Sequence, residues 1–305
     1  MFDASQYELL DFGAGRKLER FGNFVLDRPS PAAIRAQRRD PELWQQADAL
    51  FDSCDEGPGR WDILTEVPET WDVRHGPVVF HLKLGSQGAI GLFPEQAENW
   101  DWIEAHVRAA DRPARVLNLF AYTGGSTLAV AAAGAEVTHV DAARTAIGWA
   151  RQNAGASGLE NATIRWIEED ALKFARRELK RGNSYDAVIL DPPSYGRGPR
   201  GESWKLEEQL DEILSVCHEL MARGRGFLLV SCHSGELAFA EPLHERVLGG
   251  LPELAGSGVV SAHDMRLRTA RGDRELQSGA AIRWSAHAAP RSSVRSPSSS
   301  NLANR

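Results

Sequence analysis

From Arg115 to Cys232 the sequence alternates short apolar, often β-branched runs with longer Ala-rich or amphipathic segments. This alternation is typical of βαβ units, in which helices join parallel strands and cover both faces of one sheet. It predicts an α/β protein with an open, mostly parallel sheet. The predicted strands are Val116–Phe120, Val137–Asp141, Thr163–Ile167, Ala187–Asp191 and Phe227–Ser231, and the predicted helices are Ser126–Ala133, Ala143–Ala154, Ala171–Arg181 and Trp204–Met221.

The sequence on either side of this block has a different texture. Residues 1–94 predict a small N-terminal α+β extension, rich in β-structure, and residues 95–286 predict the main domain. Residues 287–305 are rich in Ser and Arg and nearly lack apolar side chains, which predicts a disordered tail. Within the extension the predicted strands are Phe21–Leu26, Pro77–Leu84 and Ala89–Phe93.

Charge and cysteine content exclude several classes of protein. The net charge of −7 excludes a uniformly basic surface for nucleic acid, although arginines outnumber acidic residues beyond His263. Cys54, Cys217 and Cys232 form no CxxC pair and no disulfide framework. No signal peptide or apolar span of membrane length is present, so we expect a cytoplasmic protein with no membrane partner.

Polar and glycine residues follow the predicted strands in a regular order. Gly124 and Gly125 permit a tight turn after the first strand, and Asp141 ends the second. The acidic run that ends in Asp170 follows the third strand, and Asp191-Pro192-Pro193 follows the fourth. Ligands of open parallel sheets bind at this edge. One adenosine-bearing ligand would use all these groups, whereas the absent P-loop lysine argues against a nucleoside triphosphate.

Each of these signals also has an ordinary structural interpretation. A glycine pair can serve the turn alone, an Asp at a strand end can cap the next helix, and prolines can simply end a strand. The serial order of the signals favours the functional interpretation. The spacing of His, Cys and Asp offers no metal-ligand cluster, so we expect no metal.

The run Asn118 to Gly125, together with Asp141, Asp170, Asp191-Pro192-Pro193 and Ser231-Cys232-His233-Ser234-Gly235, resembles class I S-adenosylmethionine-dependent methyltransferases. Within that class it is similar to the bacterial large-subunit ribosomal RNA cytosine-C5 methyltransferases, in particular to shorter members without a PUA-type domain. Gly91 to Gln96 resembles their cofactor-covering turn, and Gly279–Trp284 their closing strand.

The resemblance implies a Rossmann-like sheet of seven strands, one of them reversed, and S-adenosylmethionine as cofactor. The methionine end of the cofactor would lie over Thr123–Gly125, the ribose at Asp141 and the adenine amino group at Asp170. Asp191 would lie beside the methyl group. The remaining implied cofactor contacts are Gln96, Asn118, Phe120, Tyr122, Ala142 and Ala171, and Pro192 and Pro193 would shape the substrate pocket.

Three hypotheses for the function stay open. C5 of cytosine is a poor nucleophile, so its methylation needs a thiolate at C6, for which Cys232 is the candidate, although a Cys that ends a buried strand is often a small hydrophobe. Alternatively, Asp191 and Tyr195 would orient an amine of a base, protein or small molecule. A third hypothesis is a nucleotide-binding oxidoreductase or an inactive adenosine-binding module.

Basic residues flank the predicted site. Arg197, Arg200 and Lys205 follow the Asp-Pro-Pro turn, and Arg266, Arg268, Arg271 and Arg274 lie downstream. Such residues would contact the phosphates of an RNA substrate at the mouth of the site, with Arg197 closest to the turn, or they would form a solvated charged face. The oligomeric state is not visible in the sequence.

Overall fold

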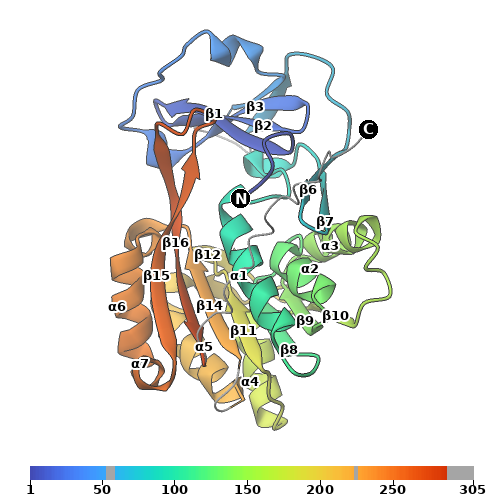
Figure 1. The fold of residues 1–305 in the computed structure, drawn as a ribbon, viewed down its shortest axis with the longest axis vertical. Coiled ribbons are helices and arrows are strands. Elements are labelled where there is room, and N and C mark those ends of the chain that lie inside the picture. Colours follow the sequence, from blue (N-terminus) through green and yellow to red (C-terminus); the bar gives the residue numbers. More distant parts are fainter. Residues whose placement is uncertain (53–58, 223–225, 287–305) are drawn as a thin grey trace, which may run out of the picture.

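The computed structural model describes residues 1–52, 59–222 and 226–286, and Figure 1 shows two parts stacked along the long axis. The lower part is a seven-stranded sheet in the order β10-β9-β8-β11-β14-β16-β15. All neighbours pair in parallel except at β16, which is antiparallel to both β14 and β15. The prediction of a mostly parallel, seven-stranded sheet with one reversed strand is confirmed. The strands are β8 (Arg115–Leu119), β9 (Glu136–Asp141), β10 (Ile164–Glu168), β11 (Ala187–Leu190), β14 (Phe227–Cys232), β15 (Val259–Arg268) and β16 (Glu275–Ser285).

Successive side chains of the central strands enter two different cores. In β11, Ala187 and Ile189 pack in the core beneath α1 and α2, whereas Val188 and Leu190 pack in the core beneath α4, α5 and α6. Strands that are apolar on both faces require helices on both sides, which explains the continuous apolar runs in the sequence. The helices are α1 (Ala97–Arg108), α2 (Gly125–Ala132), α3 (Arg144–Ala156), α4 (Ala171–Lys180), α5 (Leu206–Leu220), α6 (Ala240–Gly250) and α7 (Glu253–Ser257).

The strand order reverses between β8 and β11. The chain runs outward from β8 to β9 and β10, then returns to place β11 on the other side of β8. Such a switch point leaves a crevice at the carboxyl ends of the strands, because consecutive connections there diverge to opposite faces. The fold therefore positions a binding site at the ends of β8, β9, β10 and β11.

The upper part is built from strands. A mixed sheet has the order β1-β2-β3-β4-β5, and a separate hairpin is formed by β6 and β7. Among the described residues before 95 the helical turns are all 3₁₀, so the extension is rich in β-structure. The elements are β1 (Tyr7–Gly13), β2 (Arg16–Phe21), β3 (Phe24–Pro29), β4 (Ala49–Asp52), β5 (Arg60–Ile63), β6 (Trp71–His75), β7 (Val78–Leu82), and the 3₁₀ helices η1 (Pro31–Ala33), η2 (Leu43–Gln46) and η3 (Ser86–Gly88).

Three local predictions were wrong. The predicted strand Phe21–Leu26 is a hairpin, because Gly22 adopts φ +60° and turns the chain between β2 and β3. Ala89–Phe93 forms no strand, because Gly91 adopts φ +88° and bends the chain against the Trp149 ring. The predicted helix Trp204–Met221 begins two residues later, since its first residues pair in a short ribbon of β12 (Tyr195–Arg197) and β13 (Ser203–Lys205).

The two parts are joined by the tip of the β15–β16 hairpin, which Figure 1 shows reaching up to the N-terminal sheet. Arg274 Nη1 donates to Asp11 Oδ1 at 2.6 Å, and Leu9 forms a parallel bridge with Thr269. Within the described residues, no helix combines the length and apolar character needed to cross a bilayer. Cys54 and the predicted tail at 287–305 lie outside the described residues.

Candidate functional site

Two adjoining cavities lie at the carboxyl ends of the parallel strands. The larger has a volume of about 490 Å³, and the smaller, about 40 Å³. They share walls formed by Phe93, Phe120, Tyr122 and Asp191. The combined space has the size of a small-molecule site and lies at the switch point, where the fold predicts one.

The turn between β8 and α2 is held in an unusual backbone conformation. Phe120, Tyr122 and Gly124 adopt φ values of +57°, +49° and +90°. Non-glycine residues in this region are strained and concentrate at functional sites. The turn delivers the first backbone N–H groups of α2 to the smaller cavity, and a Cβ on Gly125 would lie 2.5 Å from the Trp100 ring. Such a helix N-terminus favours an anionic group.

Two buried polar residues hold this turn in place. Asn118 Nδ2 donates to Thr127 Oγ1 at 2.8 Å and so connects β8 to α2. Thr123 Oγ1 donates to the carbonyl oxygen of Gly91 at 2.8 Å, which connects the turn to the segment that covers it. Both residues line the smaller cavity, and their role in cofactor binding stays a prediction. Because both bonds join elements that are distant along the chain, the turn is fixed by tertiary structure as well as by its glycines.

Asp141 and Asp170 lie in the wall of the larger cavity with Ala142 and Ala171. Asp141 accepts N–H bonds from Tyr122 at 2.7 Å and from Ala143 at 2.8 Å, yet burial outweighs these bonds and raises the pKa of the carboxyl. Further donors would stabilise the charged form, and the hydroxyls of a ribose are such donors. Asp170 also caps α4 by accepting the Lys173 N–H at 2.9 Å. Its structural role and its place in the cavity wall are compatible.

Asp191 is the centre of a hydrogen-bond network on the floor of both cavities. Gln96 Nε2 donates to Asp191 Oδ2 at 3.1 Å and Ser231 Oγ donates to Oδ1 at 2.7 Å. His233 Nε2 lies 3.2 Å from Oδ1. Burial by itself would raise the pKa of Asp191, but the His233 charge and these hydrogen bonds outweigh it and lower the pKa. Asp191 is therefore a carboxylate at neutral pH.

His233 is the positive partner in this network. Burial by itself would lower the pKa of His233, but Asp191, then Glu95 and the Ser278 carbonyl, raise it to about 9. The ring also faces Phe93, with 5.6 Å between ring centroids. Ser231 and His233 belong to the site, and both lie in the Ser231–Gly235 motif that carries the family resemblance. Their position directly beside Cys232, where the fifth predicted strand ends, was the available signal.

Cys232 is placed differently. Its side chain points away from Ser231 into the core beneath α4, α5 and α6, and its exposure is 0%. Burial, with a smaller contribution from the Asp191 charge, raises the pKa of the thiol to about 12. Cys232 does not line either of the two cavities. The structure therefore brings Asp191 to the site but not the Cys232 sulfur.

Of the predicted substrate residues, three line the larger cavity and one does not. Pro192, Pro193 and Arg197 line the larger cavity, where the Trp204 indole donates to the Pro193 carbonyl at 2.7 Å and fixes the turn. Tyr195 is 53% exposed, does not line this cavity, and accepts a hydrogen bond from Arg197 Nε at 3.1 Å.

Comparison with known proteins defines the class. Residues 28–245 match the family of S-adenosylmethionine-dependent methyltransferases. A SAM-dependent methyltransferase from Agrobacterium tumefaciens is 39% identical, covers 92% of this chain and 90% of its own, and superposes with a TM-score of 0.85. SMU.776, crystallised with SAH, shares the fold at 18% identity and a TM-score of 0.69, covering 91% of this chain and 74% of its own.

The chain belongs to the S-adenosylmethionine-dependent methyltransferase family, and its cofactor is S-adenosylmethionine. The hypothesis of an oxidoreductase or a silent binding module is set aside by this membership. The ribosomal RNA large subunit methyltransferase I of Aeromonas salmonicida is 32% identical over 143 residues, which are 47% of this chain and 35% of the relative. The counterpart from Klebsiella pneumoniae (strain 342) is 28% identical, covering 59% and 48%. The chain thus matches between a third and a half of these relatives.

Proposed function

We propose that this methyltransferase acts on a base in RNA, with ribosomal RNA as the first substrate to test. The observation that supports it most is the position of Arg197, which lines the same cavity as Asp191 and the two prolines. The exposed Lys205 lies on the paired strand of the ribbon, in register with Tyr195. Cationic side chains beside the reacting end would bind backbone phosphates and direct a flipped base toward it. The relatives from Aeromonas salmonicida and Klebsiella pneumoniae, both named ribosomal RNA large subunit methyltransferase I, add independent support.

Different residues of the chain would have different roles in methyl transfer. The sulfonium of the cofactor supplies an electrophilic methyl group when it is bound. Asp141 and Asp170 would hold the adenosine, and the α2 N-terminus would hold the carboxylate. Phe93 and Phe120 would exclude water from the reacting end, while Pro192 and Pro193 would hold the base in line with the methyl. Catalysis would then depend mainly on alignment and on the fixed charges of Asp191 and His233.

For the target atom we propose C5 of cytosine, with Cys232 as the nucleophile. The thiolate would add to C6 and move the ring electrons to C5, which takes the methyl. Loss of the C5 proton to a base would then expel the thiolate. Val230 pairs with Leu190, so Cys232 ends the strand beside the one that leads into Asp191. Because the thiol is covered and its pKa is about 12, this route requires RNA binding to expose the sulfur and to deprotonate it.

The second candidate is methylation of an exocyclic amine. It is favoured by the observation that the Asp191 carboxylate reaches the cavity while the Cys232 sulfur does not. Asp191 would accept a hydrogen bond from the amine, and no covalent adduct would be needed. The two candidates predict different products, 5-methylcytidine and an N-methylated nucleoside.

One experiment tests both levels of the proposal. The protein is incubated with methyl-labelled cofactor and unmodified ribosomal RNA, and the labelled nucleosides are identified by mass spectrometry. We expect 5-methylcytidine, at least about 100-fold less of it with Cys232→Ala, and a stable protein–RNA adduct with RNA that carries 5-fluorocytosine. Cys217→Ala is the matched control, because Cys217 is an equally buried thiol in α5. An N-methylated product from fully active Cys232→Ala would remove the thiolate route, and no transfer to any RNA would contradict the RNA proposal.

A further inference from the structure

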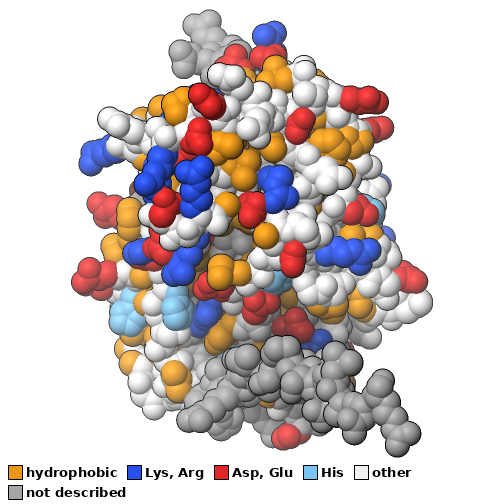
Figure 2. Space-filling model, turned by 45° about the horizontal axis from the view of Figure 1, so that its top comes forward, with side chains coloured by type: hydrophobic (Ala, Val, Ile, Leu, Met, Phe, Trp, Pro, Cys, Tyr) orange, Lys and Arg blue, Asp and Glu red, His pale blue; other side chains and the backbone are white. Residues whose placement is uncertain are grey.

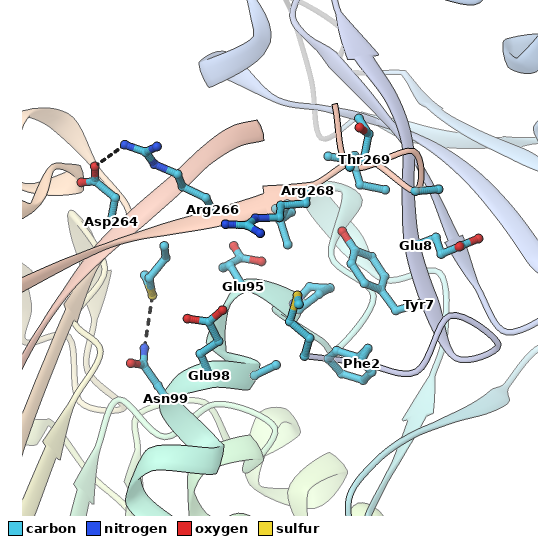
Figure 3. A pocket seen from close by; sticks show the side chains of 18 of the residues that line it. Phe2, Tyr7, Glu8, Glu95, Glu98, Asn99, Asp264, Arg266, Arg268 and Thr269 are labelled. Atoms are coloured by element: carbon cyan, nitrogen blue, oxygen red, sulfur yellow. Dashed lines mark hydrogen bonds and ion pairs between the residues drawn. The ribbon is translucent and has the colours of Figure 1, made fainter. Parts of the chain in front are cut away.

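A third cavity, of about 310 Å³, lies between the N-terminal part and the methyltransferase domain (Figure 3). The 3₁₀ helix η4 (Pro94–Gln96) separates it from the methyl-transfer site. Gln96 lines the smaller cavity of that site, whereas its neighbour Glu95 lines this one. The two sites therefore share one wall. A ligand in this cavity would lie next to the substrate group that receives the methyl.

Glu95 has an acceptor that nothing in the described structure satisfies. Its side chain is 6% exposed, and Oε1 lies 3.6 Å from His233 Nδ1. Oε2 is buried and accepts no hydrogen bond from any described residue. In Figure 3, Glu95 projects from the segment before α1 toward the cavity, beneath Arg268. A buried acceptor without a donor costs free energy, so a ligand that supplies N–H groups would be stabilised here.

The other walls restrict the body of such a ligand. Leu9, Met265 and Leu267 are at most 5% exposed and line the cavity, which suits an apolar ring. Arg266 and Arg268 project from β15 with side chains that are 50% and 61% exposed, and they pair with Asp264 and Glu275. Figure 2 shows basic side chains among acidic ones on the left of the face that is drawn, over the region of the β15–β16 hairpin. Each guanidinium carries five N–H donors, so both arginines can contact an anionic group of a ligand in addition to these carboxylates.

A neutral ring with N–H donors that is attached to an anion is a nucleotide. Adenine and cytosine present one amino donor beside a ring nitrogen acceptor, which a carboxylate repels. Uracil presents its N–H between two carbonyl oxygens. Guanine alone presents two adjacent donors, N1–H and the 2-amino group, to the two oxygens of one carboxylate.

We propose that this cavity binds a guanine nucleotide of the RNA substrate that is near the methylated base. Glu95 accepts the two guanine donors, and Arg266 and Arg268 contact the phosphate. The inference depends on the proposed RNA substrate for its biological meaning. It would make the cavity a determinant of sequence context, since the methylated base would enter only when a guanine occupies the adjoining site.

The test compares two ligands that differ in one amino group. The protein, saturated with S-adenosylhomocysteine, is titrated with guanosine and inosine 5′-monophosphate, and affinity is measured by calorimetry or saturation-transfer NMR. We expect guanosine monophosphate to bind about tenfold more tightly than inosine monophosphate. Glu95→Gln should abolish this preference, and Arg268→Gln should weaken both ligands by the same factor. Glu160→Gln removes the same charge from an exposed residue outside the three cavities and should change neither.

Equal affinity of the two ligands for the unaltered protein would overturn the proposal, and this comparison does not depend on the folding of any variant. Tighter binding of N-acetylarginine amide than of guanosine monophosphate would also overturn it, in favour of a protein substrate. The binding measurement is independent of methyl transfer. RNA methylation without guanine selectivity would remove this inference alone, whereas guanine selectivity without RNA methylation would remove the proposed function.

Discussion

The two halves of the central sheet hold their carboxylates in different ways. On the side of β9 and β10, Asp141 and Asp170 accept hydrogen bonds from backbone N–H groups, two of which lie two or three residues away along the chain. On the side of β11 and β14, Asp191 is held by side chains that are distant in sequence, among them Gln96 and Ser231. Hydrogen bonds from nearby backbone N–H groups hold a carboxylate without help from distant side chains. In a network of side chains, the protonation state of the carboxylate depends on every member of the network.

The largest expected effect is on the side of the network. Asp191→Asn keeps the shape but removes the charge, leaving the His233 imidazolium without its nearer acidic partner and the reacting end without its carboxylate. We expect kcat to fall at least about 100-fold, while affinity for S-adenosylhomocysteine changes less than about fivefold. Single-turnover rates and calorimetry measure the two. Activity within tenfold of the unaltered protein would show that the network is only structural.

On the other side, the expected loss is in binding rather than in rate. Asp141→Ala should weaken cofactor affinity by about 30- to 100-fold, which corresponds to about 2–3 kcal/mol, because a partly buried carboxylate that would accept two hydroxyls is lost. The rate at saturating cofactor should change little. Glu168→Ala is the matched control, since Glu168 pairs with Asp141 in the neighbouring strand but is exposed. An unchanged affinity in Asp141→Ala would place the ribose elsewhere.

A third prediction concerns the segment that covers both halves. Gly91 and Gly134 both adopt left-handed conformations, at φ +88° and +95°. A Cβ on Gly91 would lie 2.1 Å from the Trp149 ring, whereas nothing lies within 4 Å of one on Gly134. Gly91→Ala should therefore lower the free energy of unfolding by about 2 kcal/mol more than Gly134→Ala, which has only the backbone cost. Equal denaturant midpoints would show that the covering segment adjusts freely.

The smallest expected effect is a dependence of stability on pH. Folding raises the pKa of His233 from 6.5 to about 9, so the folded state binds the proton more tightly than the unfolded state. The resulting stability is fully present below pH 6.5 and is lost as pH rises toward 9. The loss should be about 1.4 kcal/mol for each pH unit between these two pKa values, measured by urea unfolding across that range. His233→Gln should remove this slope, and a slope that persists in the variant would assign it to another group.

The same contrast explains how much the sequence could predict. The five central strands and the turn at Gly124 were predicted because alternation, glycine and strand-end carboxylates are local signals. The β15 strand was missed, since Val259–Arg268 mixes exposed charged and partly buried residues at the sheet edge. The hydrogen-bond partners of Asp191 and the direction of the Cys232 side chain, which points into the core, depend on the register of β14 with β11. No short sequence pattern encodes that register. The hairpin at Gly22 was missed because one glycine between two apolar runs looks like part of a continuous strand.

A crystal structure of the protein with S-adenosylhomocysteine tests the central claim most directly. We predict the ribose hydroxyls within hydrogen-bond distance of Asp141, the amino-acid end against Thr123–Gly125, and the sulfur directed toward Asp191 and the two prolines. Ligand density at another edge of the sheet, or a ribose that does not contact Asp141, would contradict the account.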